Sequence, residues 1–202
     1  RRFFAQAAIA AITPPMLQRA ASAAAAVEEA IARPEVTSIL ARFVAATPPD
    51  RVPAAVRAEA VRSVVNWFGA ALGGARHETS DCVLAALGPY SHGNAVLVGR
   101  PERVDPPRAA FINGLASHVL DFDDTHLKTI IHPAGPVLPA LLALAGEKPV
   151  SGRDLLHAFI LGVEVECRLG NAIYPSHYEL GWHITGTCGV FGAAMAAGRL
   201  LG

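Results

Sequence analysis

Hydrophobic residues recur every three to four positions along most of this chain, a period that predicts helices rather than strands. Apolar positions at this spacing run from 36 to 44, and Pro48-Pro49 stops the helix that they predict. A second amphipathic helix covers residues 61–72, and Gly73-Gly74 ends it. The first part of the ordered pattern is therefore two successive helices.

Five further helices are predicted by the same spacing together with capping residues and prolines. In chain order they cover residues 80–87 with Ser80 as the N-cap, 106–125, 134–146, 151–170 and 183–201. Small residues along one side of the last helix predict that another helix approaches it closely. Residues 94–98 read as a strand, and one strand is too little for a sheet. The predicted fold class is all-α, a helical bundle.

The composition of the chain argues against several classes of partner. The chain has 202 residues, and its 17 basic residues balance 17 acidic ones. This length suffices for one domain with its own core, and the even charge argues against a nucleic-acid partner. The three cysteines lie far apart among small or apolar neighbours, so we expect buried thiols rather than disulfides. No apolar run is long enough to predict a membrane span, and we expect no membrane partner.

The first 32 residues differ from the rest of the chain. Arg1-Arg2 is followed by an apolar middle and by the small-residue tract ASAAAA, an order that resembles an export signal of the twin-arginine type. The chain does not begin with methionine, and we expect trimming upstream. Because Pro14-Pro15 interrupts the apolar middle, an alanine-rich helix outside the domain is the alternative. We expect a leader over residues 1–32 and a domain over 33–202, periplasmic if the leader is a signal and cytoplasmic otherwise.

Polar chemistry concentrates in residues 118–133, HVLDFDDTHLKTIIHP. A helix that continues to residue 125 would gather on one face His118, Asp121, Asp124 and Thr125. An imidazole beside carboxylates, near apolar packing, is suited to moving protons near pH 7. The segment is therefore the first candidate for an active site.

Two other interpretations of this segment stay open. In one, Asp123, Asp124 and Lys128 only solvate the end of a helix. In the other, the aspartates bind a divalent metal together with His126 and His132. The chain has no DDxxD, HExxH or CxxC pattern, so we expect no metal.

A second polar group lies at the predicted start of the last helix, in the stretch WHITGT. The free N–H groups and the positive end of a helix favour an anion, and His183 lies beside them. A carboxylate substrate would fit there. In the alternative interpretation, Thr185 only caps the helix and His183 is a structural residue.

Four stretches, GLASHVLDFDDTH, HPAGPVLPALLALA, GVEVECRLG and GWHITGTCGVFGAAMAAGRLLG, resemble the MmgE/PrpD family in sequence and order, over about residues 36–202. That family includes 2-methylcitrate dehydratase, cis-aconitate decarboxylase and iminodisuccinate epimerase. The resemblance implies an all-helical domain that forms homodimers, no metal or organic cofactor, and a smaller α+β lid domain that we expect outside this chain. It also implies a pocket lined by Asp121, Thr125, His132 and His183.

The resemblance implies a lyase-type reaction in which a proton moves next to a carboxylate of a small di- or tricarboxylic acid. Asp121 or His132 is expected to transfer the proton, and His183 to act as a second acid/base or carboxylate binder. The residues expected to bind the substrate are Thr125, His126 and Thr185.

Dehydration is the first expectation, although decarboxylation and epimerisation need much the same groups. The loop between Thr125 and His132 is one residue longer than in the decarboxylase type, which weakens the transfer of that substrate. Lysines that bind substrate carboxylates in the family would lie beyond Gly202. The competing classes are a non-catalytic dimerising or ligand-binding module and a metal-dependent hydrolase.

Overall fold

The structure is a computed structural model that describes residue 22 and residues 35–202. The chain divides into two units, residues 1–42 and residues 43–202. Helix α3 (Glu35–Ala46) runs from the first unit into the second. The leader predicted over residues 1–32 lies outside the described residues, except for residue 22. All of the chemistry predicted from the sequence lies in the second unit.

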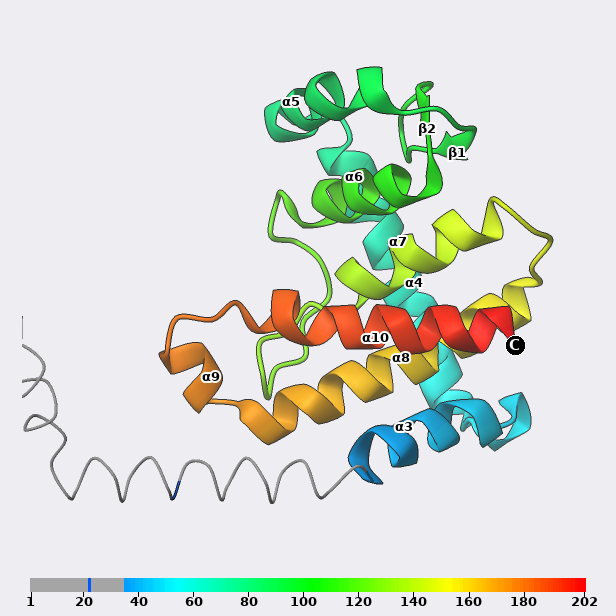
Figure 1. Ribbon diagram of the computed structural model, residues 1–202, viewed down its shortest axis with the longest axis vertical. Helices are drawn as coiled ribbons and strands as arrows, with labels where there is room; N and C mark the ends of the chain where they lie inside the picture. Colours follow the sequence, from blue (N-terminus) through cyan, green and yellow to red (C-terminus); the bar gives the residue numbers. More distant parts are fainter. Residues whose placement is uncertain (1–21, 23–34) are drawn as a thin grey trace, which may run out of the picture. The chain divides into compact units, whose positions relative to one another are not determined.

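Almost all of the regular secondary structure in the second unit is helical (Figure 1). After α3 the elements are η1 (Pro49–Arg51), α4 (Ala54–Gly74), α5 (Glu78–Leu87), η2 (Gly88–Tyr90), β1 (Ala95–Val96), β2 (Arg103–Val104), α6 (Pro106–His118), α7 (Ala134–Ala145), α8 (Gly152–Ile173), α9 (Ser176–Glu179) and α10 (Ile184–Leu201). The predicted all-α fold class is confirmed. The short helix α9 was not predicted.

Four helices, α4, α7, α8 and α10, enclose the main core. Figure 1 shows α10 (red) lying along α8 (yellow to orange), and this pair makes the most extensive contact between elements. Trp67, Leu138 and Phe159 are among the fully buried side chains here. Burying a large apolar side chain stabilises the fold by roughly 1.5–3 kcal/mol. The apolar face predicted for α4 is wrong in part, because Val61, Val65 and Leu72 are exposed and Trp67 is buried against the core in their place.

The helices α8 and α10 approach each other closely at positions that lack side chains. A Cβ atom on Gly162 would lie 2.7 Å from the carbonyl oxygen of Gly192, closer than real contacts. Helices α4 and α6 meet in the same way, since a Cβ atom on Gly74 would lie 2.0 Å from the Ala116 oxygen. The prediction that small residues of the last helix permit close approach is confirmed.

A smaller core lies between α5, α6 and a two-stranded hairpin. The strands β1 and β2 are antiparallel, with Ala95 opposite Val104 and Val96 opposite Arg103. The Asn113 side chain of α6 fixes β1, because its Nδ2 donates a hydrogen bond of 2.9 Å to the Val96 oxygen. The predicted strand is confirmed. The second strand was missed because two residues are too few to show alternation.

Helix α5 begins earlier than predicted, and its N-cap is His77 rather than Ser80. The Nδ1 atom of His77 accepts a hydrogen bond from the Thr79 N–H at 3.2 Å. Ser80 is buried, and its hydroxyl donates to the Gly74 oxygen at 2.8 Å. The prediction of a Ser80 cap is wrong because this hydroxyl instead donates to the Gly74 carbonyl at the end of α4, which also accepts from the His77 N–H at 3.1 Å.

Helix α6 ends at His118 and does not continue to residue 125. Asp121 adopts a φ of +52°, which a helix does not allow, and its N–H donates to the His118 oxygen at 2.8 Å in a turn. The single helix face predicted for His118, Asp121, Asp124 and Thr125 is therefore wrong. Residues 119–133 form a loop, so tertiary hydrogen bonds place their side chains.

Two expectations from composition are corrected. Cys82 is exposed, whereas Cys167 is partly buried and Cys188 is buried. Helix α10 is long and apolar enough, by length and composition alone, to cross a membrane, with a mean hydropathy of 1.3 over 18 residues. The sequence prediction had missed this run. Cys188 and Ala196 of this helix pack in buried apolar clusters, and Val190 and Phe191 are exposed.

Candidate active site

A pocket of about 260 Å³ lies where α6 ends, α10 begins and the loop 119–133 leads into α7. It is lined by His118, Asp121, Ile130, His132, Tyr178, His183 and Ile184. Ile184 also belongs to a buried apolar cluster with Ile131 and Cys188, which holds the start of α10 against the loop. The pocket therefore combines three imidazoles and one carboxylate with an apolar wall.

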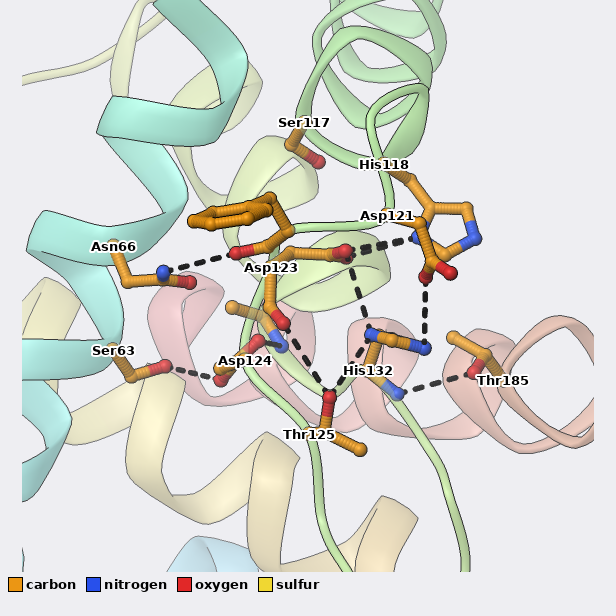
Figure 2. A network of polar contacts seen from close by, with 12 residues as sticks. Ser63, Asn66, Ser117, His118, Asp121, Asp123, Asp124, Thr125, His132 and Thr185 are labelled. Carbon is orange, nitrogen blue, oxygen red and sulfur yellow. Dashed lines mark hydrogen bonds and ion pairs between the residues drawn. The ribbon is translucent and has the colours of Figure 1, made fainter. Parts of the chain in front are cut away.

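Asp123 connects two of these histidines (Figure 2). Its side chain is 0% exposed, and His118 Nδ1 lies 3.1 Å from each carboxylate oxygen. His132 Nδ1 lies 3.4 Å from Asp123 Oδ1. A carboxylate only accepts hydrogen bonds, so His118 meets it with a protonated Nδ1, and the shorter of the two carboxylate contacts of His132 favours the same tautomer there. The neutral rings then carry their lone pairs on Nε2, and that of His132 lies 3.7 Å from Asp121 Oδ1.

His183 has the opposite arrangement of its proton. It is the N-cap of α10, and its Nδ1 accepts a hydrogen bond of 3.1 Å from the Gly186 N–H. An accepting Nδ1 places the proton of the neutral ring on Nε2. The ring centre lies 6.0 Å from that of His118. The pocket thus offers a proton acceptor from His132 and a proton donor from His183.

Thr185 fixes the loop to the last helix. Its hydroxyl oxygen accepts a hydrogen bond of 3.1 Å from the His132 N–H, and the residue is buried (Figure 2). Thr185 does not cap α10, since His183 does. The structure therefore places Thr185 behind His132, outside the lining of the pocket.

Asp124 anchors the other end of the same loop. Its Oδ1 accepts from the Ala134 N–H at 3.1 Å, and its Oδ2 accepts from the Ser63 hydroxyl at 2.5 Å. Burial raises the pKa of Asp124 above its ordinary value, and these two hydrogen bonds oppose the rise. Asp124 joins α4 to the start of α7 and does not line the histidine pocket.

Asp121, His132 and His183, the residues predicted to be catalytic, all line the pocket. Asp121 lies at its rim, with a side chain that is 80% exposed. Asparagine and aspartate tolerate its positive φ better than most residues, which suits this turn. The structure therefore brings together residues from the 118–133 segment and from the start of the last helix.

Thr125 and His126, predicted to bind substrate, line a different cavity of about 490 Å³ between α4 and α8. Thr125 still reaches the site from behind, because its hydroxyl lies 3.5 Å from His132 Nδ1. His126 Nδ1 forms a hydrogen bond of 2.7 Å with the Thr129 hydroxyl. The backbone N–H of His126 donates to the backbone oxygen of Ile131 at 2.7 Å. In this structure His126 shapes the loop rather than the pocket.

Sequence reasoning gave Asp123 no catalytic role, gave Tyr178 no role, and treated His118 only as part of a helix face. The interpretation that Asp123 and Asp124 solvate a helix end is wrong, because Asp123 is buried and Asp124 has two hydrogen-bond donors. The density of acidic residues was the available signal for Asp123. No signal pointed to Tyr178, whose position depends on the path of the chain between α8 and α10.

A group able to hold a metal also lies here, within the described part of the chain. One ligand atom from each of four residues lies within 4.8 Å of the others, and the four are His118, Asp121, Asp123 and His132. This set differs from the metal ligands considered from the sequence, since His126 and Asp124 have other partners.

Comparison with known protein families identifies the class of this protein. Residues 38–202 match the model of the MmgE/PrpD N-terminal domain. The chain belongs to the MmgE/PrpD family, as its motifs indicated.

Curated relatives carry more specific names. Cis-aconitate decarboxylase from Homo sapiens is 38% identical over 149 residues, which are 70% of this chain and 31% of that protein. Cis-aconitate decarboxylase from Aspergillus terreus is 32% identical over 178 residues, 85% of this chain and 36% of that protein. The cis-aconitate decarboxylase-like protein oryM from Aspergillus oryzae is 31% identical over 176 residues, 83% of this chain and 36% of that protein. The chain spans about a third of the length of these relatives.

Proposed function

We propose that the protein containing this chain is a lyase that acts on a small di- or tricarboxylic acid by moving a proton next to a carboxylate. The observation that carries the proposal is the opposite surroundings of Nδ1 in two histidines of one pocket, a carboxylate for His132 and a backbone N–H for His183. His132 presents a lone pair on Nε2 because its Nδ1 faces Asp123, and His183 presents an N–H because its Nδ1 caps α10. Acid–base catalysis needs one group of each kind.

Decarboxylation is the favoured reaction, because the relatives named above are cis-aconitate decarboxylases or resemble them. Loss of carbon dioxide leaves carbanion character on the substrate carbon, and a donor such as His183 Nε2–H both stabilises and protonates it. Dehydration, the first expectation from the sequence, is the second candidate. It starts with removal of a proton next to a carboxylate, for which His132 Nε2 beside Asp121 is suited.

The pocket lining lacks the positive charge that binding of a polycarboxylate requires. Among the described residues that line it, none is a lysine or an arginine, and Asp121 is acidic. A polycarboxylate therefore needs protonated imidazoles or cations from beyond residues 35–202 to balance its charge. We expect the rest of the protein, or a second copy in a homodimer, to supply those cations.

The proposal is tested by proton NMR of the full-length protein in D₂O with cis-aconitate, 2-methylcitrate, citrate, malate and iminodisuccinate, with and without a chelator. Loss of carbon dioxide with deuterium incorporated next to a carboxylate is expected for cis-aconitate. An olefinic product from 2-methylcitrate would select dehydration instead. No reaction with any acid would favour the non-catalytic module.

Matched variants separate the chemical role of His183 from its role as a helix cap. His132→Ala and His183→Ala are both expected to abolish turnover. His183→Asn keeps an oxygen that accepts from the Gly186 N–H, so α10 is expected to keep its stability while turnover is still lost. The control is His92→Ala, an exposed histidine outside the pocket, which is expected to keep full activity. An active His183→Asn protein would show that His183 is not the proton donor.

A further inference from the structure

We propose that the pocket also binds one divalent transition-metal ion of the Zn²⁺ kind, and that the ion occupies the pocket in place of substrate. Its ligands are His118, Asp121, Asp123 and His132, whose nearest ligand atoms all lie within 4.8 Å of one another. The four residues come from the end of α6 and from the loop that follows it, so one short segment supplies the whole set (Figure 2).

The distances suit tetrahedral coordination. Zinc binds nitrogen and oxygen ligands at about 2.0–2.2 Å, which puts neighbouring ligand atoms about 3.3 Å apart. Here His118 Nδ1 lies 3.1 Å and His132 Nδ1 lies 3.4 Å from Asp123 Oδ1. The Asp121 carboxylate lies 3.7 Å from the other nitrogen of His132. Both imidazole nitrogens are therefore at the required spacing from Asp123, and all four ligand atoms lie within 4.8 Å of one another.

The types of ligand select the kind of metal. Two imidazoles with two carboxylates suit Zn²⁺ and its neighbours, whereas Mg²⁺ and Ca²⁺ take oxygen ligands. The carboxylate of Asp123 is 0% exposed and is directed at both rings, so it does not bind ions as a loose surface acid would. Asp123 is the fixed centre of the site.

The electrostatics favour a cation. In the described residues, the ion pairs of Asp121 and Asp123 are made with histidines, and no lysine or arginine pairs with either. When the rings are neutral, the two carboxylates carry two negative charges that nothing nearby balances. A divalent ion removes that imbalance.

Metal binding and the proposed reaction exclude each other. Asp121 and His132 would both be occupied as ligands, and neither could then exchange a proton with a substrate. The ion would therefore act as an inhibitor, and this part of the inference rests on the proposed function. The binding part does not, because it is measured without substrate.

The binding test is calorimetric titration of the full-length protein with ZnCl₂, checked by competition with a chromogenic chelator. One equivalent is expected to bind, and MgCl₂ at the same concentration is expected not to compete. His118→Ala and Asp121→Asn are each expected to weaken binding at least about tenfold. Both side chains are partly exposed, at 39% and 80%, so these variants are expected to stay folded, which circular dichroism checks. His92→Ala is the matched control and is expected to bind as the wild type does.

The outcomes separate the two proposals. Absence of one-equivalent binding, binding that survives His118→Ala, or equal competition by Mg²⁺ would overturn the metal site. In the turnover assay, Zn²⁺ is expected to lower the rate, and a chelator is expected to restore it. A higher substrate concentration is expected to raise the Zn²⁺ concentration needed for half-maximal inhibition. Binding without inhibition of an active enzyme would overturn the exclusion of substrate. Binding by a protein that turns over no acid would support the metal site and overturn the proposed function.

Discussion

Two carboxylates are buried in the part of the chain that the structure describes, and their surroundings differ. Asp123 lies in the loop after α6 and faces the imidazoles of His118 and His132. Glu166 lies in α8 against α10, is 0% exposed, and has no hydrogen-bond partner for either oxygen. Burial raises the pKa of Glu166 to about 9, and the charge of Asp124 adds to this rise. Glu166 therefore carries its proton at neutral pH.

The difference shows how one chemical group serves two purposes. A buried carboxylate with donors around it determines where the protons of its neighbours lie, which is what Asp123 does for His132. A buried carboxylate without donors is protonated and packs as a neutral side chain, and Glu166 does so against the glycines of α10. Burial alone therefore does not identify a functional acid; its hydrogen-bond partners do.

The largest expected effect is that of Asp123→Asn. An amide replaces one of the two accepting oxygens by an NH₂ donor. The Nδ1 atom of His118, which lies 3.1 Å from both oxygens, then faces a donor as well as an acceptor, so the side chain no longer fixes the proton positions of the rings. The same exchange behind the catalytic histidine of a serine protease lowers kcat by about 10⁴. We expect a loss in kcat of about 10²–10⁴ with a smaller change in KM, measured by steady-state kinetics. A loss below about tenfold would show that Asp123 does not set the proton positions.

The pH dependence of stability tests the other carboxylate through Glu166→Gln. The pKa of Glu166 is raised in the folded protein to about 9 from 4.5, so the folded state holds a proton that the unfolded state releases. Its contribution is thus most favourable below the ordinary pKa and is lost as the pH rises towards 9. From pH 6 to pH 8 the free energy of unfolding of the wild type is expected to fall by roughly 2–3 kcal/mol relative to that of Glu166→Gln.

The measurement is urea unfolding of both proteins at the two pH values. Glu164→Gln, on the same helix but paired with Arg168 at the surface, is the matched control and is expected to follow the wild type. Equal pH dependence in wild type and Glu166→Gln would mean that Glu166 is ionised in the folded protein. The contrast between the two buried carboxylates would then disappear.

How far the sequence predicts the molecule depends on whether a residue lies in a helix or in a loop. In α8 and α10 the period of apolar and small residues indicates which side faces the core, so the close approach of these two helices was predictable. In α4 the same period failed, because Val65 and Leu72 are exposed while Trp67 is buried. The segment 119–133 has no such period. Its neighbouring residues Asp123 and Asp124 point to different partners, His118 and Ser63, which only the folded chain brings near. The motifs located the pocket, but they did not show which aspartate orients a histidine.

A smaller effect is expected when the space around Glu166 is reduced by Gly192→Ala. The added Cβ atom would lie 2.9 Å from both Cβ and Oε2 of Glu166 and 3.0 Å from the Gly162 oxygen. Because backbone on the facing helix cannot yield easily, we expect a loss of about 1–3 kcal/mol in the free energy of unfolding. Gly198→Ala, on the same helix with nothing within 4 Å, is the control and is expected to be neutral or stabilising. Equal stabilities of the two variants would contradict the tight packing of Glu166.

The smallest effect is expected for Ser63→Ala, which tests the intermediate case of Asp124. This variant removes one of the two donors to Asp124 and leaves the Ala134 N–H in place. We expect a loss of about 1 kcal/mol in thermal or urea unfolding, with kcat unchanged, since Asp124 does not line the histidine pocket. Asp124→Ala also leaves the Ala134 N–H at the start of α7 without its acceptor, so the loss in the free energy of unfolding is expected to be larger for this variant. If Ser63→Ala lowered kcat as much as Asp123→Asn, the anchoring and the orienting carboxylate would not be separable, and the loop would act as one unit.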